Sequence, residues 1–386
     1  MSTTLTAASA QWAKRPYDER FLSLPDLQAH VRSQKVLSTQ KVVAANKVIA
    51  EPTSDTADAG LKLVGANGGS EVYPTHFAFG QLSSLAGAQA RYLRTLPAAL
   101  AADCVNWGLQ SRDVTEVGLL VTRDESEGIT RQLRAATGPN YGRVWNDDLV
   151  TALIEQVGDG RTGDFRVPGE FGKPVPVTKA NTTLYAGDRD LFVFLADEEH
   201  RISVDNRRDG QPGSLARGFF VWNSEVGAGS IGAAFFLFDY ACKNRIVWGA
   251  QQYKETRIRH SSGAPDRWLR EIAPVLIQYA NSSAAPVEAT IAAAQAQKVE
   301  NIETFLRSRK FKNIASTSSE SASNGIFTAG EIAAIRQAHE REEGRPIETV
   351  WDVVTGVTAH AKTLDWQNER VAFERAGGRI LDLVAA

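Results

Sequence analysis

A segment in the second half of the sequence, residues 243–270, combines basic and aromatic side chains in a way that suits phosphate contact and base stacking. Trp248, Tyr253 and Trp268 are interleaved with the cations. If residues 254–260 form a strand, Arg257 and Arg259 share one face, because alternate side chains point the same way. The alternative is that the arginines pair with nearby acids on a solvent-exposed sheet face. The candidate nucleic-acid contacts are Lys243, Arg245, Lys254, Arg257, Arg259, His260 and Arg267.

A second motif, Gly227-Ala-Gly229-Ser-Ile-Gly232, fits the G-x-G-x-x-G pattern of dinucleotide-binding loops. Such a loop needs a helix after the glycines and, further on, a strand that ends in an acidic residue. Residues 231–240 instead carry three phenylalanines and are typical of a strand, while the nearest candidate acid, Glu255, lies in a basic run. We therefore interpret the glycines as a hairpin turn. A nucleotide-binding enzyme that uses residues 227–232 remains the alternative function.

Metal ligation and nucleophilic catalysis have less support in the sequence. No pair among the six histidines shows HxH or HExxH spacing. The acid-rich run Asp197-Glu-Glu-His200 is explained more simply as a turn between two strands. Cys104 and Cys242 form no CxxC pair, and Cys242 could act with His260 as nucleophile and base only if folding brought them together. We predict no catalytic residue, no metal and no cofactor.

The bulk composition limits the class of protein. The 386-residue length exceeds the roughly 250–300 residues at which single cores stop growing, so two structural units are expected. The formal net charge of -2 means that any contact with nucleic acid must come from a local patch. No stretch of 18 or more apolar residues and no signal peptide is present, which predicts a cytoplasmic protein without a membrane partner.

The hydrophobic pattern predicts an α+β fold: an antiparallel β-sheet core with packed helices and a helical C-terminal tail. Residues 114–122 and 129–137 are expected to pair as strands, and Asn146 is expected to cap a helix that ends at Gly158 or Gly160. The expected division begins with a polar, partly ordered N-terminal leader with one short helix (1–74), followed by an α+β core domain (75–285) and a helix (286–313). A Ser-rich linker (314–326) and a helical C-terminal tail (327–386) come next. The tail is expected to begin with a capping box formed by Thr328 and Glu331.

Several phrases together resemble the phage and plasmid-like proteins grouped as domain of unknown function 932. They are Gly218-Phe-Phe-Val-Trp-Asn-Ser-Glu-Val-Gly227, Phe-Asp-Tyr-Ala-Cys-Lys-Asn-Arg-Ile-Val-Trp248, Arg257-Ile-Arg-His260, Leu96-Pro-Ala-Ala-Leu-Ala-Ala-Asp103, Tyr141-Gly-Arg-Val-Trp-Asn146 and Trp351-Asp-Val-Val-Thr355. The likeness spans roughly residues 75–385. It implies an origin in mobile genetic elements, but no activity and no catalytic residue.

The basic segment and the resemblance together predict a non-enzymatic protein that binds or anneals single-stranded DNA. It would serve recombination or replication of a phage or plasmid in the host cytoplasm, as a homo-oligomer. A third hypothesis is a module that binds a host protein through the linker and the helical tail from residue 327.

Overall fold

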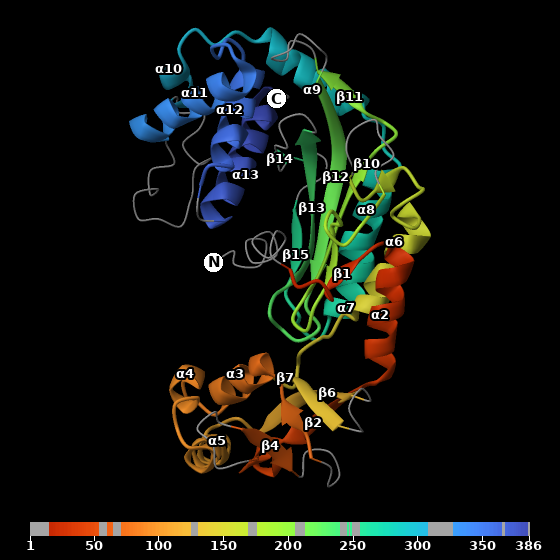
Figure 1. Cartoon of the computed structure of the whole chain (residues 1–386), viewed down its shortest axis with the longest axis vertical. Helices are drawn as coiled ribbons and strands as arrows, with labels where there is room; N and C mark the ends of the chain where they lie inside the picture. The colour runs from red at the N-terminus through yellow and green to blue at the C-terminus, as the bar shows by residue number, and fades with distance from the viewer. Residues whose placement is uncertain are drawn as a thin grey trace.

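The computed structural model describes the protein over residues 15–53, 60–64, 71–124, 130–168, 176–204, 213–239, 245–246, 248, 255–307, 327–364 and 367–384. Three parts follow one another along an arc: a small N-terminal unit, a large central sheet and a C-terminal group of helices (Figure 1). The strand pairs are antiparallel except β5–β7. The α+β prediction is therefore confirmed.

The N-terminal unit is built on a four-stranded sheet in the order β2-β6-β7-β5. Its strands are β2 (Ser38–Ala44), β6 (Glu116–Asp124), β7 (Thr130–Thr137) and β5 (Tyr73–Pro74), and β3 (Ile49–Pro52) pairs with β4 (Leu61–Val64) beside it. The helices of this unit are η1 (Ala45–Lys47), α3 (His76–Leu85), α4 (Ala90–Leu93) and α5 (Ala98–Ser111). Leu63, Leu82, Val105 and Leu119 meet in one buried cluster between these elements. The predicted pairing of 114–122 with 129–137 is confirmed by β6 and β7.

The central sheet has nine strands, and its main path runs β1-β9-β10-β12-β13-β14. Its strands are β1 (Arg20–Phe21), β8 (Phe165–Arg166), β9 (Leu184–Ala186), β10 (Leu191–Asp197), β11 (Ile202–Val204), β12 (Gly213–Asn223), β13 (Ile231–Asp239), β14 (Arg245–Ile246) and β15 (Thr256–Ile258). Its helices are α2 (Leu24–Val36), α6 (Asn146–Val157), α7 (Ala264–Arg267), η2 (Trp268–Ile272) and α8 (Ala273–Ala280), and they share a buried apolar cluster with one face of the sheet.

The C-terminal helices pack against the end of the same sheet (Figure 1). They are α9 (Ala285–Ala296), α10 (Ile302–Leu306), α11 (Ala329–Glu343), α12 (Val350–Ala361) and α13 (Gln367–Val384). Ile335 and Val354 of this group lie in one buried cluster with Leu215 and Ile246 of the sheet. The tail therefore shares a core with the sheet. The Thr328–Glu331 capping box is present as predicted.

Other expectations need correction. The predicted core domain, 75–285, is divided between two sheets with separate cores, and the expected leader supplies strands to both. Within it α2 forms where a helix was expected: Ser23 caps it, and Leu24, Leu27 and Val31 bury one face. The expected helix 286–313 is two helices, α9 and α10, which are separated where Lys298 bridges to Thr349. The expected linker, 314–326, lies outside the described residues.

No helix in the described part of the chain is long and apolar enough to cross a membrane.

Candidate functional site

The arginines of the predicted basic segment are separated, and two of them are neutralised. Arg257, in β15, forms an ion pair with Glu255, and its guanidinium lies 5.7 Å from the centre of the Trp222 ring. Glu255 also accepts a hydrogen bond of 2.7 Å from Arg375 in α13. Arg267, in α7, is held by two hydrogen bonds of 2.7 and 2.9 Å to Glu271. For these two arginines the structure shows the alternative interpretation, pairing with nearby acids.

The remaining predicted contacts do not form a row with them. Arg259 follows β15 and its side chain is exposed, with no ion pair to another described residue. Arg245 begins β14, and only its backbone is described. Lys243 and Lys254 lie outside the described residues, as does Cys242, the suggested partner of His260.

His260 is buried rather than placed on a surface. Its Nδ1 donates a hydrogen bond of 2.9 Å to the carbonyl oxygen of Gly142. Its ring stacks on Tyr141, with 4.9 Å between the ring centres. Nε2 is buried and finds no partner among the described residues. His260 therefore joins the end of β15 to the segment that leads from β7 into α6, and cannot act as a surface donor in this conformation.

The segment around Gly142 carries a second buried cation, Arg143. Its guanidinium lies 5.1 Å from the Tyr141 ring centre and 5.8 Å from that of Trp145. Nε donates to Oε1 of Gln40 at 3.1 Å, whereas Nη1 and Nη2 have no acceptor in the described part of the chain. Burial lowers the pKa of Arg143 to about 10, so the group stays charged near neutral pH. Cations and rings thus alternate through the junction of the two sheets.

Glu225 completes this junction. One carboxylate oxygen is 3.2 Å from Nη1 of Arg134 in β7, and the other accepts a hydrogen bond of 2.7 Å from the backbone N–H of Asn146. The Asn146 side chain does not cap α6 as expected, because its Oδ1 accepts from Asn223 instead; Trp145 occupies the cap position. Gly158, at φ 84°, ends the helix as predicted.

Three of the phrases that carry the family resemblance meet at this point. The phrase 141–146 contacts the other two. The Tyr141 hydroxyl donates to the Ser224 carbonyl oxygen at 2.7 Å, and the Asn146 backbone N–H donates to Glu225. The Gly142 carbonyl oxygen accepts from His260. The hydrogen bonds and the ion pair of these residues link the two sheets. We therefore assign this cluster a positioning role and name it the inter-sheet junction: Arg134, Tyr141, Arg143, Trp145, Asn223, Glu225 and His260.

The junction makes stability sensitive to pH. Burial lowers the pKa of His260 below its ordinary value of 6.5, and Arg143 lowers it further, while the Gly142 hydrogen bond acts in the opposite direction. The unfolded chain therefore binds a proton more readily than the folded one. Stability is highest above about pH 6.5 and falls as the pH drops from there toward the folded pKa.

Denaturation of the wild type and a His260→Phe variant at about pH 7.5 and pH 5.5 checks this. The variant keeps a ring on Tyr141 but does not titrate, so its stability should fall less on acidification. Because His30 and His360 also have lowered pKa values, some pH dependence will remain. Equal losses in the two proteins would contradict the assignment.

On the surface beside this junction, two arginines stack on two phenylalanines of one helix. The Arg94 guanidinium lies 4.8 Å from the ring centre of Phe79, and that of Arg189 lies 5.4 Å from Phe77. Both rings belong to α3, whereas Arg94 ends α4 and Arg189 is in the loop between β9 and β10 of the central sheet. We call these four residues the arginine–phenylalanine pair site.

The two guanidinium groups of this site are not held in ion pairs with other described residues, although Asp188 and Asp190 flank Arg189 in the sequence. Neither Arg94 nor Arg189 forms an ion pair within the described ranges; Arg94 Nη2 donates to the carbonyl oxygen of His76 at 2.8 Å. The pKa of Arg94 is lowered, by burial first and then by the positive charge of Arg189. Arg91, one helical turn before Arg94, is exposed as well. The two positive charges are therefore free to meet an anion.

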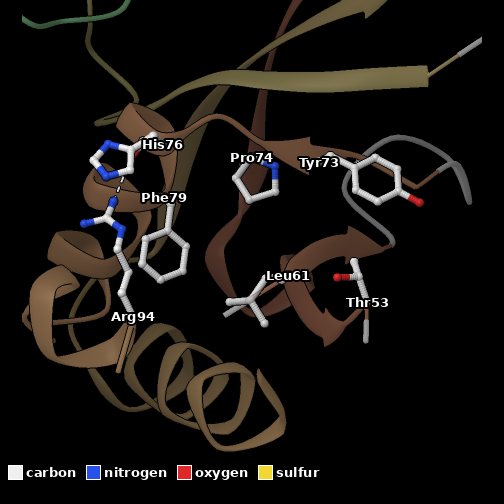
Figure 2. A pocket seen from close by; sticks show the side chains of 8 residues that line it. Thr53, Leu61, Tyr73, Pro74, His76, Phe79 and Arg94 are labelled. Carbon is white, nitrogen blue, oxygen red and sulfur yellow. Dashed lines mark hydrogen bonds between the residues drawn. The ribbon is translucent and has the colours of Figure 1, made fainter. Parts of the chain in front are cut away.

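A pocket of about 380 Å³ opens next to Arg94, between α3, α4, β5 and the β3–β4 hairpin (Figure 2). Arg94, His76 and Phe79 lie toward one end, while Tyr73 and Thr53 lie toward the other. Its lining residues are Thr53, Gly60, Leu61, Tyr73, Pro74, His76, Phe79 and Arg94. A cation, aromatic rings and apolar walls thus share one concave surface, as is usual for small-ligand sites.

The other motifs have structural explanations. The glycine motif turns β12 into β13, which pair antiparallel from Leu215↔Asp239 to Trp222↔Gly232, and only Gly227 of its glycines has a positive φ, of 84°. This confirms the hairpin and leaves the motif without the helix that a dinucleotide loop requires. Asp197 is buried, with Oδ2 3.0 Å from Arg217, and its other oxygen organises the expected turn to His200. Among the described residues no group of His, Cys, Asp and Glu could hold a metal ion.

Sequence reasoning missed Arg94 and Arg189. One signal was available: residues 72–102 contain no aspartate or glutamate, so Arg91 and Arg94 have no acid nearby along the chain. The contact of Arg189 with Phe77 could not be found this way, because it joins the two sheets.

Part of the chain matches a known protein family. Residues 178–366 match the model of a family described as a domain of unknown function, DUF932. The matched region begins just before β9 and includes Arg189 and the helices through α12, whereas the N-terminal unit with Arg94 and the pocket precedes it. No curated protein and no solved structure matches the chain.

Proposed function

The chain carries a domain of the DUF932 family at residues 178–366, and we propose that it works as a non-enzymatic protein that binds single-stranded nucleic acid, most directly single-stranded DNA. The proposal assigns the contact to the arginine–phenylalanine pair site rather than to the segment 243–270. The observation that carries it is the two unpaired guanidinium groups of Arg94 and Arg189, each lying over a phenylalanine ring of α3.

Phosphate chemistry supports the choice of ligand. A guanidinium presents several N–H donors in a plane that matches phosphate oxygens, and a ring beneath it holds that plane while leaving its edge accessible. Arg257 and Arg267 meet this requirement less well, because Glu255 and Glu271 already occupy their donors. With a net charge of -2, the chain has no general attraction for nucleic acid, so local cations that form no ion pair matter most.

The position of the site supports an extended ligand. Arg94 belongs to the N-terminal unit and Arg189 to the central sheet, so a ligand that contacts both crosses the boundary between the two units. Two contacts cross that boundary: Gln81 of α3 donates to the Val226 carbonyl oxygen at 2.7 Å, and Arg134 of β7 lies 3.2 Å from Glu225. On the central-sheet side, Ser224 Oγ donates to the Arg189 carbonyl oxygen at 2.6 Å. A single strand supplies a separate phosphate to each of the two arginines.

The wider setting follows from the resemblance to phage and plasmid-like proteins. We propose a role in annealing or recombination of mobile-element DNA in the host cytoplasm, by an oligomer of this chain. Arg259, exposed and without an ion pair to a described residue, is the member of the predicted segment that could extend the contact.

Fluorescence anisotropy with a labelled oligonucleotide at low salt tests the proposal. The wild type should bind, and a double variant Arg94→Ala, Arg189→Ala should bind at least about tenfold more weakly, since two phosphate contacts are removed. Arg336→Ala is the control, because Arg336 is an exposed arginine on α11, in the C-terminal helices. Absence of wild-type binding, or equal weakening by the control, would refute the proposal.

A further inference from the structure

We infer that the pocket beside Arg94 takes one unpaired nucleobase while Arg94 contacts the adjoining phosphate, so that the site selects single strands over duplexes. This inference rests on the proposed function and adds to it the feature that determines strand specificity.

The walls of the pocket suit a flat ring. Leu61, Pro74 and Phe79 form apolar surface, and Leu61 and Phe79 are almost fully buried, so this part of the pocket is backed by the core of the N-terminal unit. The Tyr73 ring stands at the far end from Arg94 (Figure 2). A volume of about 380 Å³ is at the lower end of the range for small-ligand sites and is large enough for a nucleobase.

Tyr73 is held in place at the pocket. Its hydroxyl donates a hydrogen bond of 2.8 Å to Glu71, and Glu71 pairs with Lys62 of β4 at 2.5 Å. Lys62 also lies 3.7 Å from Glu51, so it offsets only part of the negative charge at this end, and the phosphate is assigned to the Arg94 end. The Tyr73 side chain remains 39% exposed, so part of its ring is available for stacking.

The cationic end of the pocket is built by α3 and α4. Arg94 Nη2 is tied to the His76 carbonyl oxygen, which fixes the guanidinium over Phe79 (Figure 2). His76 is the first residue of α3, so the positive end of the helix dipole lies at the same end. A phosphate at Arg94 and its base against Pro74 and Tyr73 occupy opposite ends of one site.

Strand selection follows from access. A base within a duplex is stacked and paired, and its edge cannot enter a pocket of this kind without being extruded, whereas a base in a single strand is free to enter. Phosphate contacts alone would not distinguish the two forms in this way. The pocket should therefore affect single-strand affinity and leave duplex affinity unchanged.

Thr53→Trp tests this, because Thr53 is exposed at the pocket and a larger side chain there fills it. We expect single-strand affinity to fall about tenfold and duplex affinity to stay the same. Tyr73→Ala, which removes one wall, should act in the same direction, and either variant suffices if the other fails to fold. Trp107→Ala, a change of a 74% exposed aromatic on α5 outside the pocket, is the control.

The outcomes separate this inference from the proposed function. If the pocket variants bind both strand forms like the wild type, or weaken both forms alike, the base pocket is refuted. The proposed function then still stands on the wild-type affinity and the double arginine variant. If the wild type binds no oligonucleotide, the proposed function is refuted and the base pocket with it.

Discussion

Replacing Glu225 with alanine is expected to lower the free energy of unfolding by about 3–5 kcal/mol. Both partners of the Arg134–Glu225 pair are buried, with side chains 7% and 1% exposed. The substitution leaves the Arg134 guanidinium buried without its carboxylate and also removes the acceptor of the Asn146 backbone N–H. Removing one member of a buried pair is costly because the remaining charge has lost both water and its partner.

Chemical denaturation monitored by tryptophan fluorescence gives the comparison, with Glu199→Ala as the matched control. Glu199 also pairs with an arginine, Arg166, but its side chain is 56% exposed. A surface pair of this kind contributes ~0–1 kcal/mol, so the control should be close to the wild type. If Glu225→Ala were no more destabilising than Glu199→Ala, the inter-sheet junction would not be a structural anchor.

The second large effect is expected from Gly142→Ala. A Cβ at this position would lie 1.8 Å from the backbone carbonyl oxygen of Ser261 and 2.7 Å from its carbonyl carbon. Because backbone cannot rotate away as a side chain can, residues 260–261 must shift, and the His260–Gly142 hydrogen bond would be strained. We expect a loss at the upper end of the ~1–3 kcal/mol that overpacking usually costs.

Gly138→Ala provides the control for this change in the same segment. A Cβ at Gly138 meets no atom within 4 Å, and its φ is not positive, so alanine should be tolerated. Thermal unfolding of the two variants checks the contrast. Similar midpoints for both would mean that the close approach of Gly142 to Ser261 is not required by the fold.

The local parts of the fold could be predicted from the sequence because their causes are local. The three phenylalanines within residues 231–240, together with the glycine-rich turn that precedes them, predicted the β12–β13 hairpin. Thr328 and Glu331, three residues apart, were enough to place the start of α11. The apolar spacing of Leu27 and Val31 likewise marked the helix in the N-terminal part.

Features that depend on long-range packing could not be predicted. His260 was expected on the surface because its neighbours are basic, but it is buried by a contact with Gly142, 118 residues away. The ion pair of Glu225 with Arg134 could not be predicted either, because the two residues are 91 positions apart in the sequence. The division of the expected core into two sheets has the same origin, since β2 in the presumed leader pairs along its length with β6.

The positive charge of the candidate site also depends on long-range packing, so it could not be predicted from the sequence. A count of cations favoured residues 243–270, but ion pairing in the folded chain decides which cations are available to a ligand. Arg257 and Arg267 form ion pairs, whereas Arg94 and Arg189 form none within the described ranges. Pairing across the fold, rather than composition along the chain, decides which surface remains positive.

The salt dependence of oligonucleotide binding tests the central claim most directly. Each phosphate contact contributes about 0.7 to the slope of log affinity against log salt concentration for single strands. If Arg94 and Arg189 each neutralise one phosphate, the slope of the Arg94→Ala, Arg189→Ala variant should be smaller than that of the wild type by about 1.4. A variant slope equal to that of the wild type would show that these arginines do not contact the nucleic acid.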